Sequence, residues 1–574
     1  MSTRRLALSL LALGCGSSTP PAADAGADVS ADVAVDAPLP DLPAADAGGP
    51  RDYAWVEPPS TVVVEPGVRR DAFLVDAPPP PPNPTTNTPT PAQYNRVQVL
   101  RYRVDATPAR AARAVIVAMP GFLGGAGSFD ALARAVVSRS ATGEGPVEVW
   151  AIDRRSNLLE DLRGMHTAER LGDNEIAAAY YNDREATVGG QGFSDFPAAN
   201  DPALAFMSEW GLATTVNDLR AVVARVPDSR QHVILLGHSL GASIVEAYAA
   251  WDFDGVAGYR SIAGIALVDG VAGGAPARED AWRTGASTGI PGVGSVGVDA
   301  LRASGPRYFA LPLLGVRALV ISEIVARRAL AQPDAVVEDR ARDSVLRLLL
   351  GVSPLPDISN AAALGLAFDD RSCPLAFARM SCGAPVGGAV ETRANAFAPG
   401  ETVTVPSDSS ATYRWTDAPA TQPREFTSIR ANARAWSATP SNFSEWFFPS
   451  RLPTDVAALG DMRLAPDSWQ VQNGIRAMHG GEIDVPVLGI ATALVGRADA
   501  FDRVRDRVAP TLGMDLPNAG AARAQPEAFR ASFVPGMTHL DPITGDGDNP
   551  ANPVPGDVLA FATRATRGST TPTP

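Results

Sequence analysis

The stretch Val233-Ile234-Leu235-Leu236-Gly237-His238-Ser239-Leu240-Gly241 carries the strongest structural signal of this sequence. Its first four residues are apolar and favour β-structure, which predicts a strand buried on both faces, and helical spacing follows at residues 242–251. A serine with glycines two positions before and after it fits a sharp turn from strand to helix, because glycine lets neighbouring elements approach closely. Such a turn presents the Ser239 hydroxyl at the sheet edge, beside the positive end of the following helix.

Further apolar runs alternate with helical patterns on both sides of this motif. Several of the runs are continuous rather than alternating, as in strands that are covered on both faces. The alternation predicts an α/β fold with a mostly parallel central sheet and helices on both faces. The expected strands are residues 97–104, 114–119, 147–152, 232–236, 262–268 and 485–490, and the expected helices are 129–138, 215–226 and 242–251.

The alternation stops between about residues 272 and 482. This interval holds helical patterns at 311–330 and 340–350, a hairpin pattern near 402–415, and the aromatic cluster Trp446, Phe447 and Phe448. We expect it to be a large cap or lid inserted into the sheet domain, which then consists of residues 52–271 and 483–567. A length of 574 residues exceeds what one hydrophobic core usually supports, which agrees with a core and an insertion.

The N-terminus predicts export. Arg4 and Arg5 precede the short apolar run 6–13, which is too brief to cross a bilayer. Ala12-Leu13-Gly14-Cys15 resembles a bacterial lipobox, which implies removal of residues 1–14 as a signal peptide and a lipid anchor on Cys15. This predicts a cell-envelope lipoprotein, on the periplasmic side or at the cell surface, with a plain secretory signal as the alternative. Residues 15–51, rich in Ala, Asp and Pro, are expected to be a disordered tether, and 568–574 a disordered tail.

Composition excludes some classes of partner. The formal charge of -14 repels phosphate backbones and no basic stripe offsets it, so we expect no nucleic-acid binding. Cys373 and Cys382 can close a small disulfide in an oxidising compartment, with two free thiols as the alternative. The histidines are isolated and no cysteine spacing suits zinc, so no metal is expected, and we interpret the acidic segment 541–549 as a solvated loop. The sequence carries no signal for the oligomeric state.

The motif and its surroundings resemble the α/β-hydrolase family. That family orders an oxyanion loop, a nucleophile, an acid and a late histidine along the chain, and this sequence has a candidate for each in that order. The resemblance implies that Ser239 is the nucleophile and that His539, in Val534-Pro535-Gly536-Met537-Thr538-His539, is the base. It also implies that the backbone N–H groups of Phe122 and Leu240 form the oxyanion hole. Met119-Pro120 stands where the family often has His-Gly.

The acid remains open at this stage. Asp499 is the first choice, because it follows the predicted strand 485–490 in a Gly-x-x-Asp pattern, although it lies far from the start of that strand. Asp269 is the alternative, at the tip of the predicted strand 262–268, and Asp502 is a third candidate. The polar turn that follows the strand 147–152, beginning at Asp153, is expected to be a structural strand exit, with a salt-bridge network that frames the pocket as the alternative.

The resemblance implies a serine hydrolase that cleaves carboxylic esters through an acyl-enzyme on Ser239, without a cofactor. The apolar helices and the cluster of Trp446, Phe447 and Phe448 in the insertion predict an apolar pocket, suited to a small-molecule ester of a medium-length or bulky acid. An amidase or peptidase that uses the same residues is one alternative. A non-catalytic, surface-tethered binding protein of the same fold is another, because a fold does not determine a function.

Overall fold

The structure is a computed structural model that describes residues 49–106, 111–142, 145–285, 296–310, 315–417, 425–508 and 528–566. The predicted signal peptide, Cys15, nearly all of the predicted tether and the predicted tail 568–574 lie outside the described residues. Among the described residues, no helix is both long enough and apolar enough to cross a bilayer.

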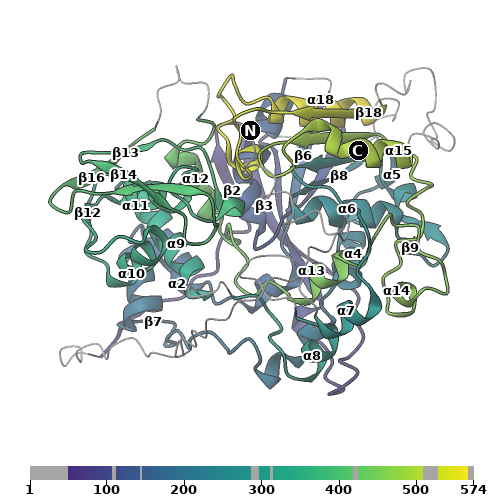
Figure 1. Cartoon of the computed structure of the whole chain (residues 1–574), viewed down its shortest axis with the longest axis horizontal. Coiled ribbons are helices and arrows are strands. Elements are labelled where there is room, and N and C mark those ends of the chain that lie inside the picture. The colour runs from purple at the N-terminus through teal and green to yellow at the C-terminus, as the bar shows by residue number, and fades with distance from the viewer. Residues whose placement is uncertain are drawn as a thin grey trace, which may run out of the picture.

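A nine-stranded sheet forms the centre of the molecule, in the order β18-β17-β11-β8-β5-β6-β4-β3-β2 (Figure 1). The strands from β18 to β6 run parallel, and β4, β3 and β2 continue the sheet in antiparallel pairs, so the sheet is mostly parallel as expected. The strands are β2 (Thr61–Glu65), β3 (Val68–Asp76), β4 (Arg96–Val104), β5 (Ala114–Met119), β6 (Val147–Ile152), β8 (Val233–His238), β11 (Gly264–Val268), β17 (Val487–Ala491) and β18 (Phe529–Phe533).

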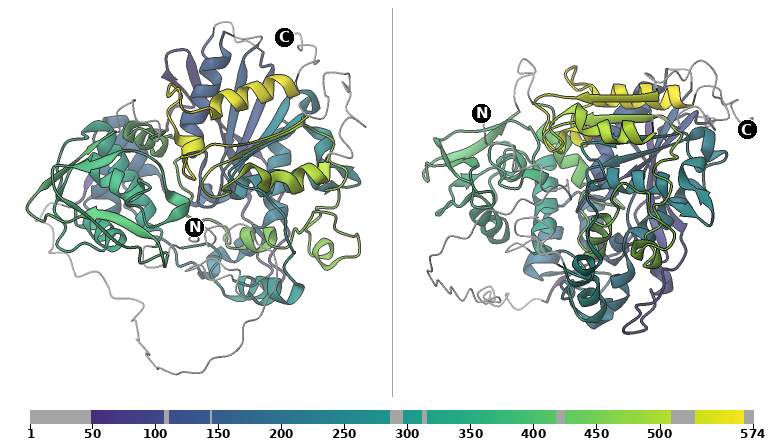
Figure 2. Two further views of the ribbon diagram at one scale, coloured as in Figure 1. Left: turned by 45° about the horizontal axis from the view of Figure 1, so that its top comes forward. Right: turned by 45° about the vertical axis from the view of Figure 1, so that its right-hand side comes forward.

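Alternate residues of the parallel strands pack into two separate cores. In β5, Val115 and Val117 belong to one core and Ile116 and Ala118 to the other. The helices α4 (Leu212–Val223), α6 (Leu240–Ala250) and α15 (Asp502–Val508) cover the first face, and α1 (Asp130–Ser140) and α18 (Val554–Ala565) cover the second. The left view of Figure 2 shows the yellow helix α18 lying across the sheet. Burial on both faces accounts for the continuous apolar runs in these strands.

The chain between β11 and β17 forms two groups of elements on different sides of the sheet (Figures 1 and 2). One group is a lobe built from α9 (Arg317–Ala331), α10 (Arg340–Leu350), α11 (Asn360–Phe368), α12 (Ile429–Trp436) and the strands β12 (Asp357–Ile358), β13 (Ala384–Val386), β14 (Val390–Ala394), β15 (Thr402–Pro406) and β16 (Thr412–Thr416). The other group holds α7 (Glu279–Thr284), α8 (Val298–Ala303) and α13 (Arg451–Val456), and α13 contacts α4 and α6. Apolar residues of the lobe share one core with α1 and α18, so the lobe is packed onto the sheet domain.

Two expectations for this region are wrong. Residues 402–415 do not form a hairpin, because β15 pairs with β14 while β16 pairs with β12 and β13. The strand β16 is drawn into the lobe by its packing against α11, where the ring of Trp415 lies so close to Gly365 that a Cβ there would come within 2.4 Å of it. Cys373 and Cys382 form no disulfide: both are buried free thiols, and the Cys373 thiol donates to the carbonyl of Leu375 at 3.5 Å.

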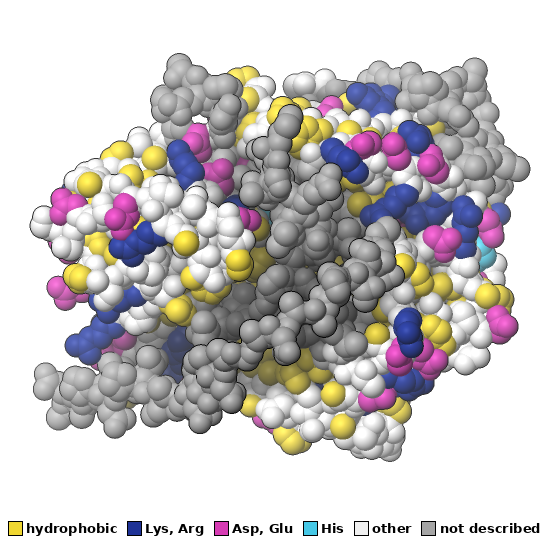
Figure 3. Space-filling view, in the orientation of Figure 1, with side chains coloured by type: hydrophobic (Ala, Val, Ile, Leu, Met, Phe, Trp, Pro, Cys, Tyr) yellow, Lys and Arg dark blue, Asp and Glu magenta, His cyan; other side chains and the backbone are white. Residues whose placement is uncertain are grey.

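On the face shown in Figure 3, acidic side chains lie near the basic side chains of the described residues. Arginines on this chain commonly pair with carboxylates instead of standing together, as in the contacts of Arg103 with Asp71 and of Arg302 with Glu209.

Candidate active site

Ser239 lies at a strained turn between β8 and α6. Its backbone has φ 57° and ψ −124°, a conformation that residues other than glycine rarely adopt and that the surrounding structure must impose. The N–H of Ser239 donates to the carbonyl of Val268 at 2.9 Å, which ties the turn to the end of β11. A Cβ on Gly237 would come within 2.2 Å of the Gly241 carbonyl oxygen, so the turn needs the predicted glycine there.

The loop after β5 lies directly against Ser239. A Cβ on Gly121 would come within 2.8 Å of Ser239 Cβ and 3.3 Å of its Oγ. The Gly121 backbone therefore packs against the Ser239 side chain, and a larger residue would not fit there. The Phe122 ring packs against Phe309 and Phe448, with ring centroids 5.0 and 4.8 Å away. Within the described part of the chain, the backbone N–H groups of Phe122 and Leu240 donate to no protein acceptor, which leaves both available to a ligand.

The structure pairs His539 with Asp269. His539 Nδ1 lies 2.7 Å from Asp269 Oδ2, and both side chains are buried. The Asp269 carboxylate also accepts from the N–H groups of Thr492 and Val495 at 2.7 and 3.0 Å. Burial by itself raises the pKa of Asp269, but the hydrogen bond and charge of His539 and the Val495 N–H outweigh it and lower the pKa below its usual value. Asp269 is therefore a carboxylate at neutral pH.

Asp499, the first choice for the acid, does not reach His539. Its side chain is 57% exposed and pairs with Arg497 at 2.8 Å, at the start of the short helix η9 (Ala498–Phe501). Asp502 is half-buried and pairs with Arg505 at 3.0 Å. The reason is local: after β17 the chain folds the N–H groups of Thr492 and Val495 onto Asp269, and it then turns outward before it reaches Asp499.

His238 has a role that the sequence did not predict. Its Nε2 lies 2.8 Å from the His539 carbonyl oxygen, and the two imidazole rings are 4.6 Å apart between centroids. Burial, and then the proximity of His539, lower the pKa of His238 to about 3. His238 is therefore a neutral ring that donates to the backbone of His539 and holds it in place. Only its position beside Ser239 could have indicated this.

The other histidines lie apart from this pair. His166 stacks on Trp55 at 5.9 Å, His232 Nδ1 is 2.8 Å from the Arg113 carbonyl oxygen, and His479 Nδ1 is 3.0 Å from Glu482. Burial lowers the pKa of His166 to about 3. Among the described residues there is no group of three or more His, Cys, Asp or Glu side chains placed to hold a metal ion.

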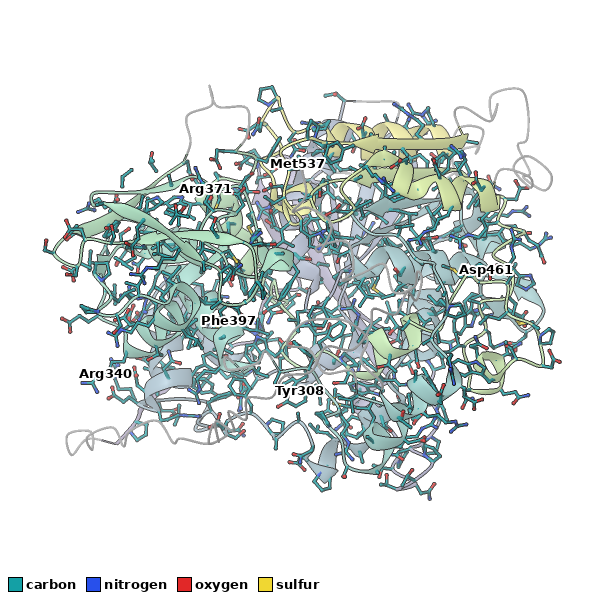
Figure 4. All side chains as sticks on the ribbon, in the orientation of Figure 1. Tyr308, Arg340, Arg371, Phe397, Asp461 and Met537 are labelled. Atoms are coloured by element: carbon teal, nitrogen blue, oxygen red, sulfur yellow. The ribbon has the colours of Figure 1, made fainter. Side chains whose placement is uncertain are left out.

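Asp541 fastens the loop that carries His539. It is buried at the start of α17 (Asp541–Thr544) and is not part of a solvated loop, contrary to expectation. Its carboxylate accepts from the Thr538 N–H at 2.7 Å, from the Ser381 N–H and hydroxyl at 2.9 and 2.8 Å, and from the Thr427 hydroxyl at 2.8 Å. Ser381 and Thr427 belong to the lobe, so Asp541 joins the lobe to the His539 loop. Figure 4 labels Met537, two residues before His539, at this junction.

Ser239 and His539 open into one cavity with about 930 Å³ of empty space, its mouth included. Most of its walls are apolar, and the lobe supplies many of them. The described lining contains no Asp, Glu or Arg side chain. The large apolar side chains around it are Leu319, Val345, Leu349, Phe368, Leu375, Phe377, Trp436, Phe443, Leu540 and Ile543.

The aromatic cluster that was expected to form the pocket lies behind it. Trp446 packs against Tyr181 at 5.9 Å, Phe447 packs against Tyr308 at 5.1 Å, and Phe448 supports Phe122. Figure 4 labels Tyr308, well below Met537 in that view. Phe448 is buried in the core that α4 and α6 share, whereas Trp446 and Phe447 are buried in a third core together with residues of α9. Trp436, Phe377, Phe368 and Phe443 take the place in the cavity that they were expected to have.

No protein-family model and no curated protein matches the sequence. Solved structures do match it. A peroxisomal alpha-beta-hydrolase from Saccharomyces cerevisiae is 8% identical, with 88% of this chain and 92% of that chain covered and a TM-score of 0.35. An epoxide hydrolase from Vigna radiata is 13% identical, with 85% and 98% covered and a TM-score of 0.34. A hypothetical protein from Pseudomonas aeruginosa is 14% identical, with 82% and 96% covered and a TM-score of 0.28.

Proposed function

We propose that this protein is a serine hydrolase that cleaves uncharged carboxylic esters through an acyl-enzyme on Ser239. The observation that carries the proposal is the buried pair of His539 and Asp269, 2.7 Å apart, which opens into the same cavity as the strained Ser239. A hydroxyl group becomes a useful nucleophile when a base takes its proton, and a carboxylate on the far nitrogen of that base fixes its tautomer and orientation. Asp269 replaces Asp499 as the acid in this triad.

The reaction runs in two halves. His539 Nε2 takes the Ser239 proton while Oγ attacks the ester carbonyl, and the N–H groups of Phe122 and Leu240 receive the developing oxyanion. The tetrahedral species collapses, the C–O bond to the alcohol breaks, and His539 returns the proton to the departing alcohol. Water then attacks the acyl-enzyme with His539 as base, which releases the carboxylic acid and restores Ser239.

The cavity supports an apolar acyl group. A charged substrate would lose its hydration there without gaining an opposite charge, because the described lining holds no ionic side chain. The lobe supplies α9, α10 and α12 to the walls, so we propose that the insertion acts as a cap that selects the substrate. Export as a lipoprotein anchored through Cys15 is part of the proposal.

A panel of p-nitrophenyl esters tests this function. Acetate, butyrate, octanoate, laurate and benzoate are compared with the matching p-nitroanilides, which detect amidase activity, and with a succinate half-ester, which carries a charge. We expect ester hydrolysis with the best kcat/KM on an apolar acyl group, and its loss in Ser239→Ala. Ser261→Ala is the matched control, because the Ser261 hydroxyl donates to the Gly258 carbonyl at 2.8 Å, on the short helix η7 (Gly258–Ser261). Equal activity of the wild type and Ser239→Ala would refute the proposal.

A further inference from the structure

Arg154 lies in the polar turn after β6 and reaches the loop that carries Phe122. Its guanidinium is buried, with Nη2 bonded to the carbonyls of Pro120 and Gly121, the latter at 3.1 Å, and Nη1 at 3.3 Å from the carbonyl of Gly124. One side chain thus binds three carbonyl groups of a single loop. The planar, multiply donating guanidinium suits this task better than any other side chain.

The contact with Gly121 determines where the Phe122 N–H points. The Gly121 carbonyl and the Phe122 N–H belong to one planar trans peptide, so the two groups point in opposite directions. Because Arg154 binds the carbonyl from one side, the N–H is directed to the other side. The Gly121 Cα lies on the Ser239 side of the loop, as the 2.8 Å approach of a Cβ there to Ser239 shows. The positive charge of Arg154 beside the Gly121 carbonyl oxygen also polarises the peptide and makes its N–H a stronger donor.

The other side of Arg154 is held by Glu445. Glu445 Oε2 accepts from Arg154 Nη1 at 2.6 Å, its second oxygen accepts from the Ser156 hydroxyl, and its side chain is fully buried. The Glu445 N–H donates to the Leu123 carbonyl at 2.9 Å, so the same residue also grips the loop through its backbone. The Arg154 guanidinium lies over the Phe448 ring at 5.2 Å. Arg154 is therefore confined on all sides and has little freedom to move away.

We propose that Arg154, fixed by Glu445, is a positioning residue that holds the Gly121–Phe122 peptide with its N–H directed at the oxyanion. This inference rests on the proposed function and goes beyond it, because neither residue belongs to the triad or donates to the substrate. It also assigns a role to the polar turn after β6, which from the sequence was expected to be a structural strand exit.

The expected consequence is selective. A misdirected N–H donor weakens the transition state much more than the bound ester, so kcat falls while KM changes little. Loss of one oxyanion donor costs about 10²- to 10³-fold in kcat, and a donor that remains but is loosely aimed should lose about 10- to 100-fold. A boronic acid mimics the tetrahedral state: its boron accepts the Ser239 oxygen while His539 takes the proton.

The experiment compares Arg154→Met and Arg154→Lys with Arg155→Met in the full chain. Arg155 is a close match, because it is the next residue and is also buried. It pairs with the carboxylate of Asp218 and lies 5.9 Å from the Trp210 ring. Unlike Arg154, it forms no described hydrogen bond with the Phe122 loop. Both methionine variants lose a buried ion pair. Each protein is measured for folding by circular dichroism, for kcat and KM on an ester, and for inhibition by phenylboronic acid, with Ser239→Ala alongside.

We expect Arg154→Met to lose about 10- to 100-fold in kcat, with KM within about threefold and boronate inhibition weakened in proportion to kcat/KM. Arg154→Lys should show the same split with a smaller loss, and it carries the test if Arg154→Met does not fold. Arg155→Met should keep its kcat and boronate affinity within about threefold of the wild type. The inference is overturned if folded Arg154 variants keep the wild-type kcat, or if their kcat falls without a loss of boronate affinity. It is also overturned if Arg155→Met loses kcat and boronate affinity to the same extent as Arg154→Met. Retained activity in Ser239→Ala would instead overturn the proposed function.

Discussion

Asp269 owes its proposed role to a set of contacts that Asp499 lacks. It is buried beneath His539 and accepts from the N–H groups of Thr492 and Val495, which hold its carboxylate still. The side chain of Asp499 is more than half exposed and is bonded only to its neighbour Arg497 among the described contacts. Two aspartates that follow neighbouring strands of one sheet thus have opposite environments, and only one of them can fix an imidazole.

Asp269→Asn is expected to lower kcat by about 10³- to 10⁴-fold, because an amide cannot hold the histidine in the tautomer that accepts the serine proton. Asp499→Asn is the matched control and should keep kcat within about twofold, since an exposed ion pair contributes little. Steady-state kinetics on one ester, with circular dichroism as a check on folding, measures both. A large loss in Asp499→Asn combined with an active Asp269→Asn would reverse the assignment.

At the scale of elements, the position of His539 depends on the short helix α17. Asp541 holds this helix to Ser381 and Thr427 of the lobe, and burial raises the pKa of Asp541 to about 6 in spite of its donors. Removing its carboxylate leaves several buried donors without an acceptor. The His539 loop would then lose its fixed connection to the lobe.

We expect Asp541→Ala to lower the free energy of unfolding by about 3 kcal/mol or more, because each orphaned buried donor costs about 1 kcal/mol or more. The kcat should fall with it, since His539 loses its support. Thermal unfolding and ester kinetics give the two quantities. Asp548→Ala, at an exposed position seven residues further on, should change neither, and comparable losses in both variants would show that Asp541 has no special role.

The elements that could be predicted were those with an unambiguous pattern. The strands β5 and β6 and the helix α10 fall at their expected bounds, because continuous apolar runs and a regular helical period leave little choice. The strands β2 and β3 were not anticipated: residues such as Arg69, Arg70 and Asp71 break their apolar pattern because these strands lie at the antiparallel end of the sheet and are partly exposed.

The candidate site could be predicted in part for a similar reason. Ser239 and His539 both line the cavity. Each could be predicted from its local sequence, because one is a serine flanked by glycines and the other is a histidine that follows a late strand. The acid depended on which strand lies beside which. The order β17-β11-β8 places the tip of β11 between the other two, next to His539, and no local pattern around Asp269 or Asp499 contains that information. The supports at His238, Arg154 and Asp541 depend equally on long-range contacts.

For the molecule as a whole, buried carboxyl groups should make stability depend on pH. Burial, first of all, raises the pKa of Glu323 in α9 to about 7 and that of Asp369 to about 7, well above the values of exposed carboxyls. A group whose pKa is raised in the folded state stabilises the fold below its unfolded pKa, and that contribution is lost as the pH rises through the folded value. Stability contributed by these groups should therefore fall between about pH 4 and about pH 7.

Glu323→Gln isolates one such contribution. The amide keeps the shape of the neutral acid and cannot ionise, so the variant should match the wild type at low pH and exceed its free energy of unfolding by up to about 3 kcal/mol near pH 8. Urea unfolding at a series of pH values measures this difference. Glu338→Gln, outside the buried set, serves as the control. A difference between wild type and Glu323→Gln that does not grow with pH would contradict the expectation.

The most direct test of the whole account is to locate the covalent adduct of a fluorophosphonate by peptide mass spectrometry. The probe phosphonylates an activated serine with loss of fluoride, and its phosphoryl oxygen occupies the oxyanion hole. We predict one adduct per chain, on the peptide that contains Ser239, with none in Ser239→Ala and slow labelling in His539→Gln. A folded wild-type protein that remains unlabelled, or that carries the adduct on another residue, would contradict the account.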